Sequence, residues 1–328
     1  MYNTLSPTRK LFVDNAHELF PDLNGQINRD QIKAVCAKFN LNSPQWLLMP
    51  ENKVSRGVFR IPTPEHHEYV APVQETDEEI EVRIADTYES METLVQAVAS
   101  NTVNSLIISG AAGLGKSHTV NKILNEINGG DFGYIVHKGY LRATHLFRML
   151  WENRHAGMTV VIDDCDAIFT DEVALNMLKA SLEMKPVRRI GWGSEKVFVD
   201  EDNEEIPRYF DFMGSVIFLT NKNIHEEIAS NNKNSVHLAA LESRSLILDL
   251  GIKSKREYMI KIKQTIKAGM LRDNGFTQVQ ENEIMDFITE NADGFRELSL
   301  RMVEKVAALF RANPNNWKKL VKSVCMSH

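Results

Sequence analysis

The segment Leu106–Val120 constrains this chain more than any other part of its sequence. It reads LIISGAAGLGKSHTV, an apolar run followed by the pattern G-x-x-x-x-G-K-S, with Gly110, Gly115, Lys116 and Ser117 at the fixed places. In this pattern the glycines let consecutive backbone N–H groups turn toward a phosphate at the start of the following helix. The segment therefore predicts a strand, a phosphate-binding loop and a helix, in that order.

The loop and the first turn of its helix carry the expected nucleotide contacts. The residues expected to bind the nucleotide are Gly110, Ala111, Ala112, Gly113, Leu114, Gly115, Lys116, Ser117 and His118. Lys116 is expected to reach the β- and γ-phosphates, and the Ser117 hydroxyl to bind Mg²⁺. A glycine-rich turn without a nucleotide has a similar composition, but strand, loop, Lys-Ser pair and helix together favour ATP and Mg²⁺ as cofactors.

A second apolar run, Thr159–Ile162, ends in the carboxylates of Asp163, Asp164 and Asp166. A strand that ends in carboxylates is what the other half of a nucleotide site needs. Asp163 is expected to hold Mg²⁺ through water, and a second carboxylate to polarise the attacking water. Acidic residues after a strand are also common in ordinary loops, so the assignment depends on the phosphate loop.

The pattern of apolar runs divides the chain into four regions. We expect a small, mainly helical domain at 1–61, a linker at 62–81, an α/β domain at 82–250 and a helical domain at 251–328. The linker is proline-rich and acidic, and the last region has apolar residues three and four apart. Alternating short apolar runs and helical stretches predict a parallel sheet covered by helices. The expected strands are Leu106–Ser109, Tyr134–His137, Thr159–Ile162, Val216–Thr220 and Leu246–Leu250.

Composition sets limits on the class of protein. The 328 residues carry 38 Lys and Arg against 44 Asp and Glu, a net charge of −6, which excludes a nucleic-acid-binding field over the whole protein but leaves a local patch open. Three scattered cysteines predict reduced thiols and a cytoplasmic location. No run approaches the ~18 apolar residues of a membrane span, so no membrane partner is expected.

The phosphate loop and the DDCDAIF segment resemble the AAA+ ATPase family over roughly residues 82–310. The resemblance implies a three-layer parallel-sheet P-loop domain with a C-terminal helical lid, ATP hydrolysis, and a ring or helical homo-oligomer. Asp164 stands where the family's catalytic glutamate is usual. Because aspartate is one methylene shorter, a slow ATPase, or a protein that mainly binds nucleotide, stays open.

Three further segments follow the family pattern. Ser215–Asn221 is similar to the sensor 1 segment, so Asn221 is expected to orient the lytic water; the alternative is an Asn that caps a loop after the strand. Arg244, in the Ser-Arg segment, would be an arginine finger that enters a neighbouring subunit's site, or else an ordinary surface ion pair. Asp293–Leu298 resembles sensor 2 and is expected to open a helix, with Arg296 at the γ-phosphate and Arg301 facing solvent.

Candidate adenine and substrate contacts are less specific. The adenine is expected near Ile84–Tyr88. Tyr140 and Leu141 follow the second strand of the sheet, where they either grip a polymer in the pore of a ring or pack into the next helix. Residues 188–213 predict a β-hairpin with an acidic tip at Asp200–Glu205, and the residues expected to add positive charge there are Arg188, Arg189, Lys196 and Arg208.

The N-terminal region predicts a helix at Arg29–Phe39, a short helix at Pro44–Met49 capped by Asn42 or Ser43, and a basic strand at Lys53–Ile61. This is the outline of a winged-helix-like module that binds nucleic acid, or of a small adaptor that docks proteins. The leading hypothesis for the whole chain is an oligomeric ATP-hydrolysing motor or switch in DNA metabolism or macromolecular remodelling. The alternative is a nucleotide-gated assembly protein with weak hydrolysis.

Overall fold

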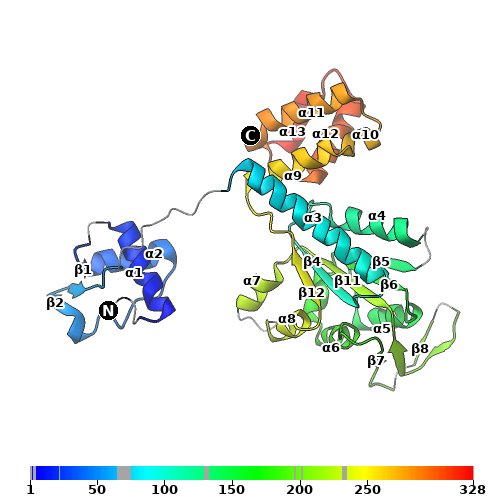
Figure 1. Cartoon of the computed structure of the whole chain (residues 1–328), viewed down its shortest axis with the longest axis horizontal. Helices are drawn as coiled ribbons and strands as arrows, with labels where there is room; N and C mark the ends of the chain where they lie inside the picture. The colour runs from blue at the N-terminus through cyan, green and yellow to red at the C-terminus, as the bar shows by residue number, and fades with distance from the viewer. Residues whose placement is uncertain are drawn as a thin grey trace. The chain divides into compact units, whose positions relative to one another are not determined.

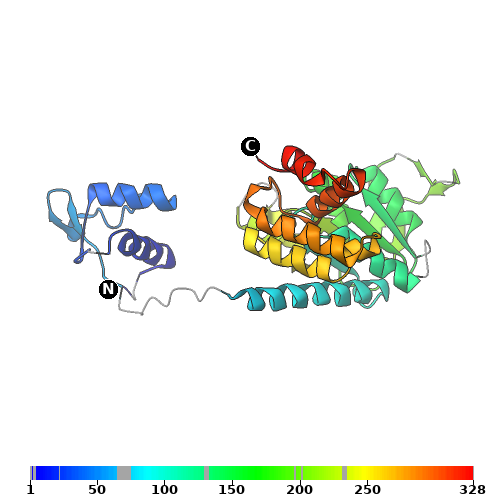
Figure 2. The same cartoon turned by 90° about the horizontal axis from the view of Figure 1, so that it is seen from above.

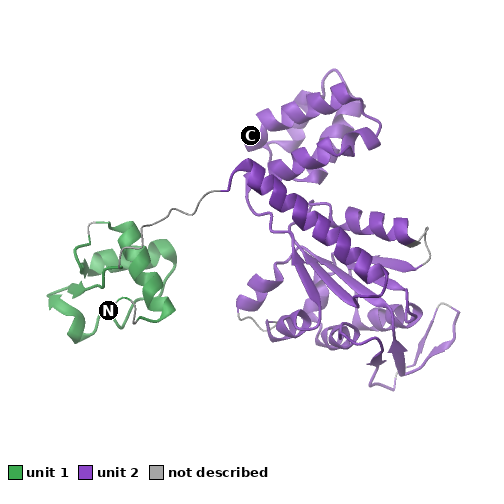
Figure 3. Cartoon of the chain, in the orientation of Figure 1, with its two compact units in different colours: residues 1–74 green, residues 75–328 purple. Residues whose placement is uncertain are grey.

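The computed structural model describes residues 2, 5–21, 23–64, 75–128, 133–195, 197–200, 202–230 and 235–327. The chain forms two compact units, residues 1–74 and 75–328 (Figure 3). Of the expected linker, residues 65–74 lie outside the described residues. Its last five residues, 77–81, belong to a long helix, α3, which spans Asp77–Ala99. This helix begins there because Thr76 caps it in a capping box with Glu79.

Unit 1 is a helical module with a small three-stranded sheet of order β1-β3-β2. Its elements are α1 (Pro7–Leu19), β1 (Gln26–Asn28), α2 (Arg29–Phe39), a 3-10 turn η2 (Pro50–Asn52), β2 (Lys53–Ser55) and β3 (Val58–Arg60). Its apolar core includes Val13, Val35 and Leu47, all fully buried. The expected helix at Pro44–Met49 is wrong: this segment is a turn, so Asn42 and Ser43 cap no helix there.

Unit 2 is built on a five-stranded parallel sheet of order β12-β4-β11-β6-β5 (Figure 1). The strands are β4 (Ser105–Ser109), β5 (Tyr134–Lys138), β6 (Thr159–Asp163), β11 (Ser215–Thr220) and β12 (Leu246–Asp249). All five predicted strands are confirmed, with shifts of one residue at their ends. Numbered by their order in the chain, the strands run 5-1-4-3-2 across the sheet.

Helices cover both faces of this sheet, so the domain has three layers. The helices of unit 2 up to the last sheet strand are α3, α4 (Lys116–Asn128), α5 (Ala143–Glu152), η3 (Asp166–Thr170), α6 (Glu172–Ser181), α7 (Ile224–Ala229) and α8 (Ser235–Glu242). Successive strand residues point to opposite faces. Leu106 and Ile108 therefore pack in one core with α3 and α4, whereas Ile107 packs in another with α5 and α6.

A hairpin extension enters between α6 and β11. Its outer part is β8 (Phe198–Val199) paired with β9 (Glu205–Ile206), and its inner part is β7 (Arg188–Gly191) paired with β10 (Tyr209–Phe212). The predicted hairpin therefore exists as two successive antiparallel pairs. Arg188 does not add positive charge to the surface of the hairpin, because its side chain is buried against the Phe212 ring. Burial lowers the pKa of Arg188 to about 10. Lys196 lies outside the described residues.

Residues after β12 form a helical lid. Its elements are α9 (Lys255–Lys267), α10 (Met270–Asp273), α11 (Gln278–Glu290), η4 (Ala292–Gly294), α12 (Leu300–Ala312) and α13 (Trp317–Cys325). These helices enclose their own core around Ile284, Val306 and Trp317. Figure 2 shows α9 beside the long helix α3. Among the described residues, no helix is both long enough and apolar enough to cross a membrane.

Candidate functional site

The phosphate loop lies between the end of β4 and the start of α4, at the carboxyl edge of the sheet. Gly113 has φ +75°, and a Cβ at this position would lie 2.6 Å from the Cβ of Ser299 in the lid. Gly115 has φ +85°. Only glycine adopts these angles without strain and also admits so close a neighbour. The bend of the loop therefore explains Gly115 of the pattern, and the contact with the lid explains the additional Gly113.

Lys116 begins α4 and is 6% exposed. Its ammonium donates to the backbone oxygens of Gly110 and Ala111 and to Oδ1 of Asn221, at 2.9 Å for the last. Within the described residues it forms no ion pair with a carboxylate. Burial lowers the pKa of Lys116, while the nearby carboxylates of Asp164 and Asp163 raise it. A buried cation bonded only to neutral oxygens suits a site that receives an anion.

Asn221 connects this lysine to the acidic segment. Its Nδ2 donates to Oδ1 of Asp164 at 2.6 Å, and Nη2 of Arg301 lies 3.9 Å from Oδ2 of the same carboxylate. Lys116, Asn221, Asp164 and Arg301 thus form a continuous polar row. We call these four residues the polar row.

Asp164 occupies an unusual backbone conformation for a residue other than glycine. Its φ is +54°, in the left-handed region, where aspartate and asparagine are tolerated better than other side chains. The bend follows directly on β6, and the Asp164 N–H donates to the Leu219 oxygen of the neighbouring strand. The conformation lifts the second carboxylate out of the strand and turns it toward Asn221.

Asp163 and Ser117 are the two residues expected to bind Mg²⁺. Asp163 is 2% exposed at the end of β6, and Nζ of Lys138 on the adjacent strand β5 lies 3.0 Å from its Oδ2. Ser117 is half-buried in the first turn of α4. A hydroxyl and a buried carboxylate are oxygen donors of the kind that a hard divalent cation prefers alongside phosphates. The residues present therefore fit Mg²⁺ bound together with a nucleotide.

The remaining loop residues differ in exposure: Ala111 and Ala112 are half-buried, whereas His118 is exposed. Near the carboxylates, Thr220 Oγ1 donates to Oδ1 of Asp166 at 2.6 Å and so ties the ends of β11 and β6 together. The sequence did not predict this partner of Asp166, because β6 and β11 are far apart in the chain and meet only in the folded sheet.

The lid brings Arg301, not Arg296, to the polar row. The expectation that Asp293–Leu298 opens a helix is wrong, because α12 begins at Leu300 after the N-cap Ser299. The Leu300 N–H donates to the Gly113 oxygen at 2.9 Å, which places the start of α12 on the phosphate loop. Arg301 is 57% exposed but faces Asp164. Arg296 is exposed, and its N–H donates to the Cys325 oxygen. The Ser299 capping signal could have located this helix start.

Arg244 lies at the opposite edge of the sheet from the phosphate loop. Its carbonyl oxygen accepts from Oγ of Ser105, the first residue of β4, whereas the loop follows the last residue of that strand. Five residues of strand separate the two, about 16 Å. The Arg244 side chain is half-buried and donates to the Ala240 oxygen at 2.6 Å. The structure therefore does not bring Arg244 to the polar row of its own chain.

The expected adenine region touches the loop from the other side. Ile84 is buried, and Tyr88 donates its hydroxyl to the Leu114 oxygen. Nζ of Lys261, on lid helix α9, lies 3.1 Å from the centre of the Tyr88 ring, and burial lowers the pKa of Lys261 to about 8. Two lid helices thus contact the phosphate loop. Helix α12 does so directly, and α9 does so through the Tyr88 side chain.

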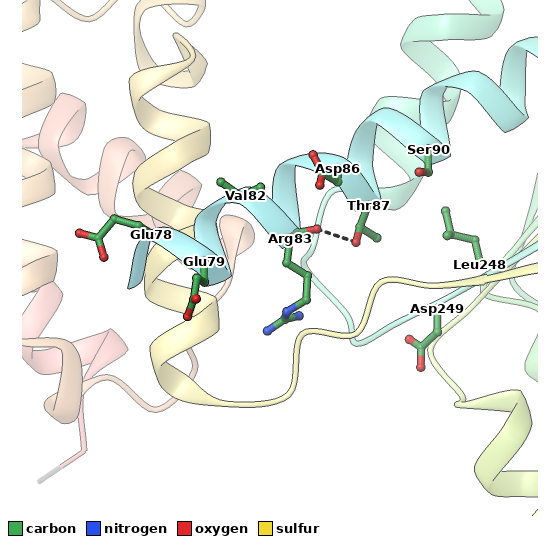
Figure 4. A pocket seen from close by; sticks show the side chains of 9 residues that line it. All are labelled: Glu78, Glu79, Val82, Arg83, Asp86, Thr87, Ser90, Leu248 and Asp249. Atoms are coloured by element: carbon green, nitrogen blue, oxygen red, sulfur yellow. Dashed lines mark hydrogen bonds between the residues drawn. The ribbon is translucent and has the colours of Figure 1, made fainter. Parts of the chain in front are cut away.

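A cavity of about 590 Å³ opens beside α3 and the end of β12 (Figure 4). Its lining residues are Glu78, Glu79, Val82, Arg83, Asp86, Thr87, Ser90, Leu248 and Asp249. No residue of the phosphate loop contributes to it. Four carboxylates against one guanidinium make it a poor site for a triphosphate, so we place the candidate nucleotide site at the loop and not in this cavity.

The two candidate pore residues separate in the structure. Tyr140 is 68% exposed and receives a hydrogen bond from Nε of Arg142 at 3.0 Å, whereas Leu141 is 2% exposed and belongs to the core beneath α5. Of the two alternatives, packing into the core therefore holds for Leu141. Of these two residues, only Tyr140 is exposed enough to contact a partner.

Comparisons with known proteins include a relative from a bacterial virus. No family model matches the sequence. The chain is 32% identical over 255 residues to the "uncharacterized 36.7 kDa protein in nrdC-mobD intergenic region" of Enterobacteria phage T4, which covers 76% of this chain and 77% of the relative.

Solved structures resemble the chain at low similarity. They include the Thermotoga maritima RuvB Holliday junction branch migration motor (14% identity, TM-score 0.37, 76% of this chain and 70% of the other). NtrX from Brucella abortus in complex with ATP follows (12%, TM-score 0.42, 74% and 53%), as does S. cerevisiae Hsp104 in a complex with casein (12%, TM-score 0.41, 72% and 41%). At TM-scores below 0.5 we draw nothing from these likenesses.

The assignment depends instead on the chain's own features: the sheet order 5-1-4-3-2, the phosphate loop after the first strand, the carboxylates after the third and the Asn after the fourth. A helical lid contacts the loop, as expected of the AAA+ arrangement. The chain therefore belongs to one family with the 36.7 kDa protein of phage T4, and its fold is the three-layer P-loop arrangement that the resemblance to AAA+ ATPases implies.

Proposed function

We propose that this protein binds Mg-ATP and hydrolyses it as an oligomeric motor or switch in DNA metabolism or macromolecular remodelling. The observation that carries the proposal is the polar row, in which Lys116 is buried and, in the part of the chain that the structure describes, forms no ion pair with a carboxylate. Such a cation is costly unless an anion joins it, and a triphosphate supplies that anion.

Each group of the site has a proposed task. The loop amides and Lys116 bind the β- and γ-phosphates, and Ser117 and Asp163 hold Mg²⁺, which neutralises charge on the phosphates. Asp164 and Asn221, joined at 2.6 Å, orient and polarise the attacking water. Arg301 contacts the γ-phosphate from the lid in place of the Arg296 suggested by the sequence.

Hydrolysis requires a second subunit in this proposal. Arg244 lies about 16 Å along the strand from the loop, so it cannot serve the site of its own chain. A ring or helical homo-oligomer brings the amino edge of one sheet near the carboxyl edge of the next, where Arg244 stabilises charge on the transferred phosphoryl group. Because Ala240 holds the guanidinium in the isolated chain, assembly must exchange that hydrogen bond for the phosphate.

The proposed substrate is a polymer, DNA or protein, contacted by the exposed Tyr140 and by unit 1. The proposed location is the cytoplasm, where ATP is abundant and thiols stay reduced; Cys36, Cys165 and Cys325 are all free.

A second function remains a candidate because of Asp164. Its carboxylate already accepts from Asn221 and faces Arg301, and it is one methylene shorter than glutamate, so the water must approach more closely. In this alternative ATP orders a ring or filament and little is hydrolysed.

One experiment separates the two functions. Nucleotide binding is measured with a fluorescent ATP analogue in magnesium buffer, and steady-state phosphate release is measured on the same protein with and without single-stranded DNA. DNA-stimulated release supports the motor. Tight binding with almost no release, and with Asp164→Glu increasing the release, supports the assembly switch. Absence of nucleotide binding contradicts both.

A further inference from the structure

Unit 1 carries a group of cations that the nucleotide site does not use. Residues 1–64 contain eight Lys and Arg against five Asp and Glu, a net charge of +3 in a chain whose net charge is −6. Four of these cations, Arg29, Lys33, Lys53 and Arg56, are exposed, and none forms an ion pair in the described part of unit 1. We call these four residues the basic wing cluster.

The fold of unit 1 brings the cluster together. The strands β2 and β3 form a hairpin whose turn contains Arg56 and Gly57, and the Arg29 N–H at the start of α2 donates to the Gly57 oxygen at 3.2 Å. The Arg29 guanidinium also lies over the Phe59 ring, and Lys53 is the cross-strand partner of Phe59. Arg29, Lys53 and Arg56 therefore meet at the base and tip of one hairpin.

Lys33 extends the cluster along α2. It lies four residues after Arg29, one helical turn away, so the two side chains share a face of the helix. Two other cations of unit 1, Lys38 and Arg60, lie outside the cluster. Lys38 lies nine positions after Arg29, about half a rotation around the helix, so it faces the other side of α2. Arg60 pairs with Gln26 on the strand face opposite Phe59.

We propose that the basic wing cluster binds the phosphate backbone of duplex DNA. Exposed cations without carboxylate partners release the counterions of DNA on binding, which gives affinity without base recognition. The segment Pro44–Met49, where a winged-helix protein has the helix that enters the major groove, is a turn here. The surface therefore fits contacts to the backbone and not to base edges.

The test uses the full chain and a fluorescein-labelled 24-base-pair duplex, with anisotropy followed from 50 to 200 mM KCl. The double variant Lys53→Gln/Arg56→Gln is compared with Lys38→Gln/Arg60→Gln, which removes the same charge from the same unit outside the cluster. We expect the first variant to bind at least about 10-fold more weakly at 100 mM KCl, and its slope of log K against log[salt] to be about 2 smaller. The second variant should stay within about 2-fold of the parent.

Three results overturn the proposal: no binding of the duplex by the parent protein, equal loss in both double variants, or no loss in the first. A second duplex of unrelated sequence should bind with an affinity within a few-fold, and a difference above about 10-fold would contradict backbone recognition. ATP-analogue binding is measured in parallel and should be the same in all three proteins. Failure of this proposal is thereby distinguished from failure of the proposed ATPase.

Discussion

A basic side chain lies at each end of the strands of the central sheet, and the surroundings of the two side chains differ. At the carboxyl edge, Lys116 is 6% exposed and bonded to oxygens of the phosphate loop and Asn221. At the amino edge, Arg244 is half-buried and donates to a carbonyl of its own helix α8. The first arrangement suits an anion brought by a ligand. The second is satisfied within the single chain, and in the proposed function it acts only beside another subunit.

If the proposed function holds, the difference teaches that one chain contains most of a hydrolytic site but not all of it. The proposed phosphate contacts lie together at the carboxyl ends of the strands. The proposed transition-state arginine, Arg244, lies at the amino end of the same sheet. Variants at each edge should therefore separate binding from turnover.

The largest expected effect is on turnover. Arg244→Ala should reduce phosphate release by about 10³-fold or more and leave binding of the ATP analogue unchanged, because the arginine acts only on the transferring phosphoryl group. Mixing Arg244→Ala with Lys116→Ala protein should restore part of the turnover, since one subunit supplies the loop and the other the finger. Equal loss of binding and turnover in Arg244→Ala, or no recovery on mixing, would contradict a role across subunits.

Lys116→Ala should weaken binding of the ATP analogue by about 100-fold, because charge-assisted hydrogen bonds to the phosphates are lost. Fluorescence titration in magnesium buffer measures the change. Lys122→Ala, an exposed lysine on the same helix α4, is the control and should bind as the parent does. If the two variants bind equally well, the phosphate site is elsewhere.

Asp163→Asn should reduce magnesium-dependent phosphate release by about 100-fold, since the buried carboxylate is the proposed anchor of the metal. The measurement is turnover against magnesium concentration. The exposed carboxylate variant Asp86→Asn on α3 serves for comparison. Unchanged turnover in Asp163→Asn at every magnesium concentration rules out the metal role.

Arg301→Ala and Arg296→Ala test which lid arginine serves the site. We expect about a 10-fold loss of turnover for Arg301→Ala, a modest effect because the side chain is 57% exposed and its charge is screened. Arg296→Ala should change turnover little, because its side chain is exposed and its backbone N–H donates to the Cys325 oxygen. The reverse outcome restores the assignment made from the sequence.

The smallest effect concerns stability at the lid. Burial lowers the pKa of Lys261 to about 8, so the folded protein loses this proton before the unfolded chain does, whose lysine titrates near 10.4. Stability should therefore rise with pH between about 8 and 10.4, and the full cost of the buried charge is present below pH 8.

Lys261→Met removes that charge and keeps the aliphatic stem over Tyr88. It should stabilise the protein at pH 7 by roughly 1–3 kcal/mol and flatten the rise above pH 8. Thermal unfolding at several pH values measures both. A variant less stable than the parent at pH 7 would show that the contact between the Lys261 ammonium and the Tyr88 ring outweighs the burial of charge.

Local sequence determined a large part of this protein. The strand, loop and helix around Lys116 follow from apolar residues, glycines and a helix start that are neighbours in the chain, and so do the strands that end in Asp163 and near Asn221. Such elements need only short-range patterns, because backbone geometry and side-chain alternation act over a few residues.

Tertiary structure decided which charged groups meet. Arg301 reaches Asp164 because the lid docks on Gly113, and Arg188 is buried because the pairing of β7 with β10 places it against the Phe212 ring. The sequence favoured Arg296 and an exposed Arg188, since spacing along one element does not reveal what another element packs against it. Burial and long-range packing set the environment of a charge, and they arise only when distant segments of the chain come together.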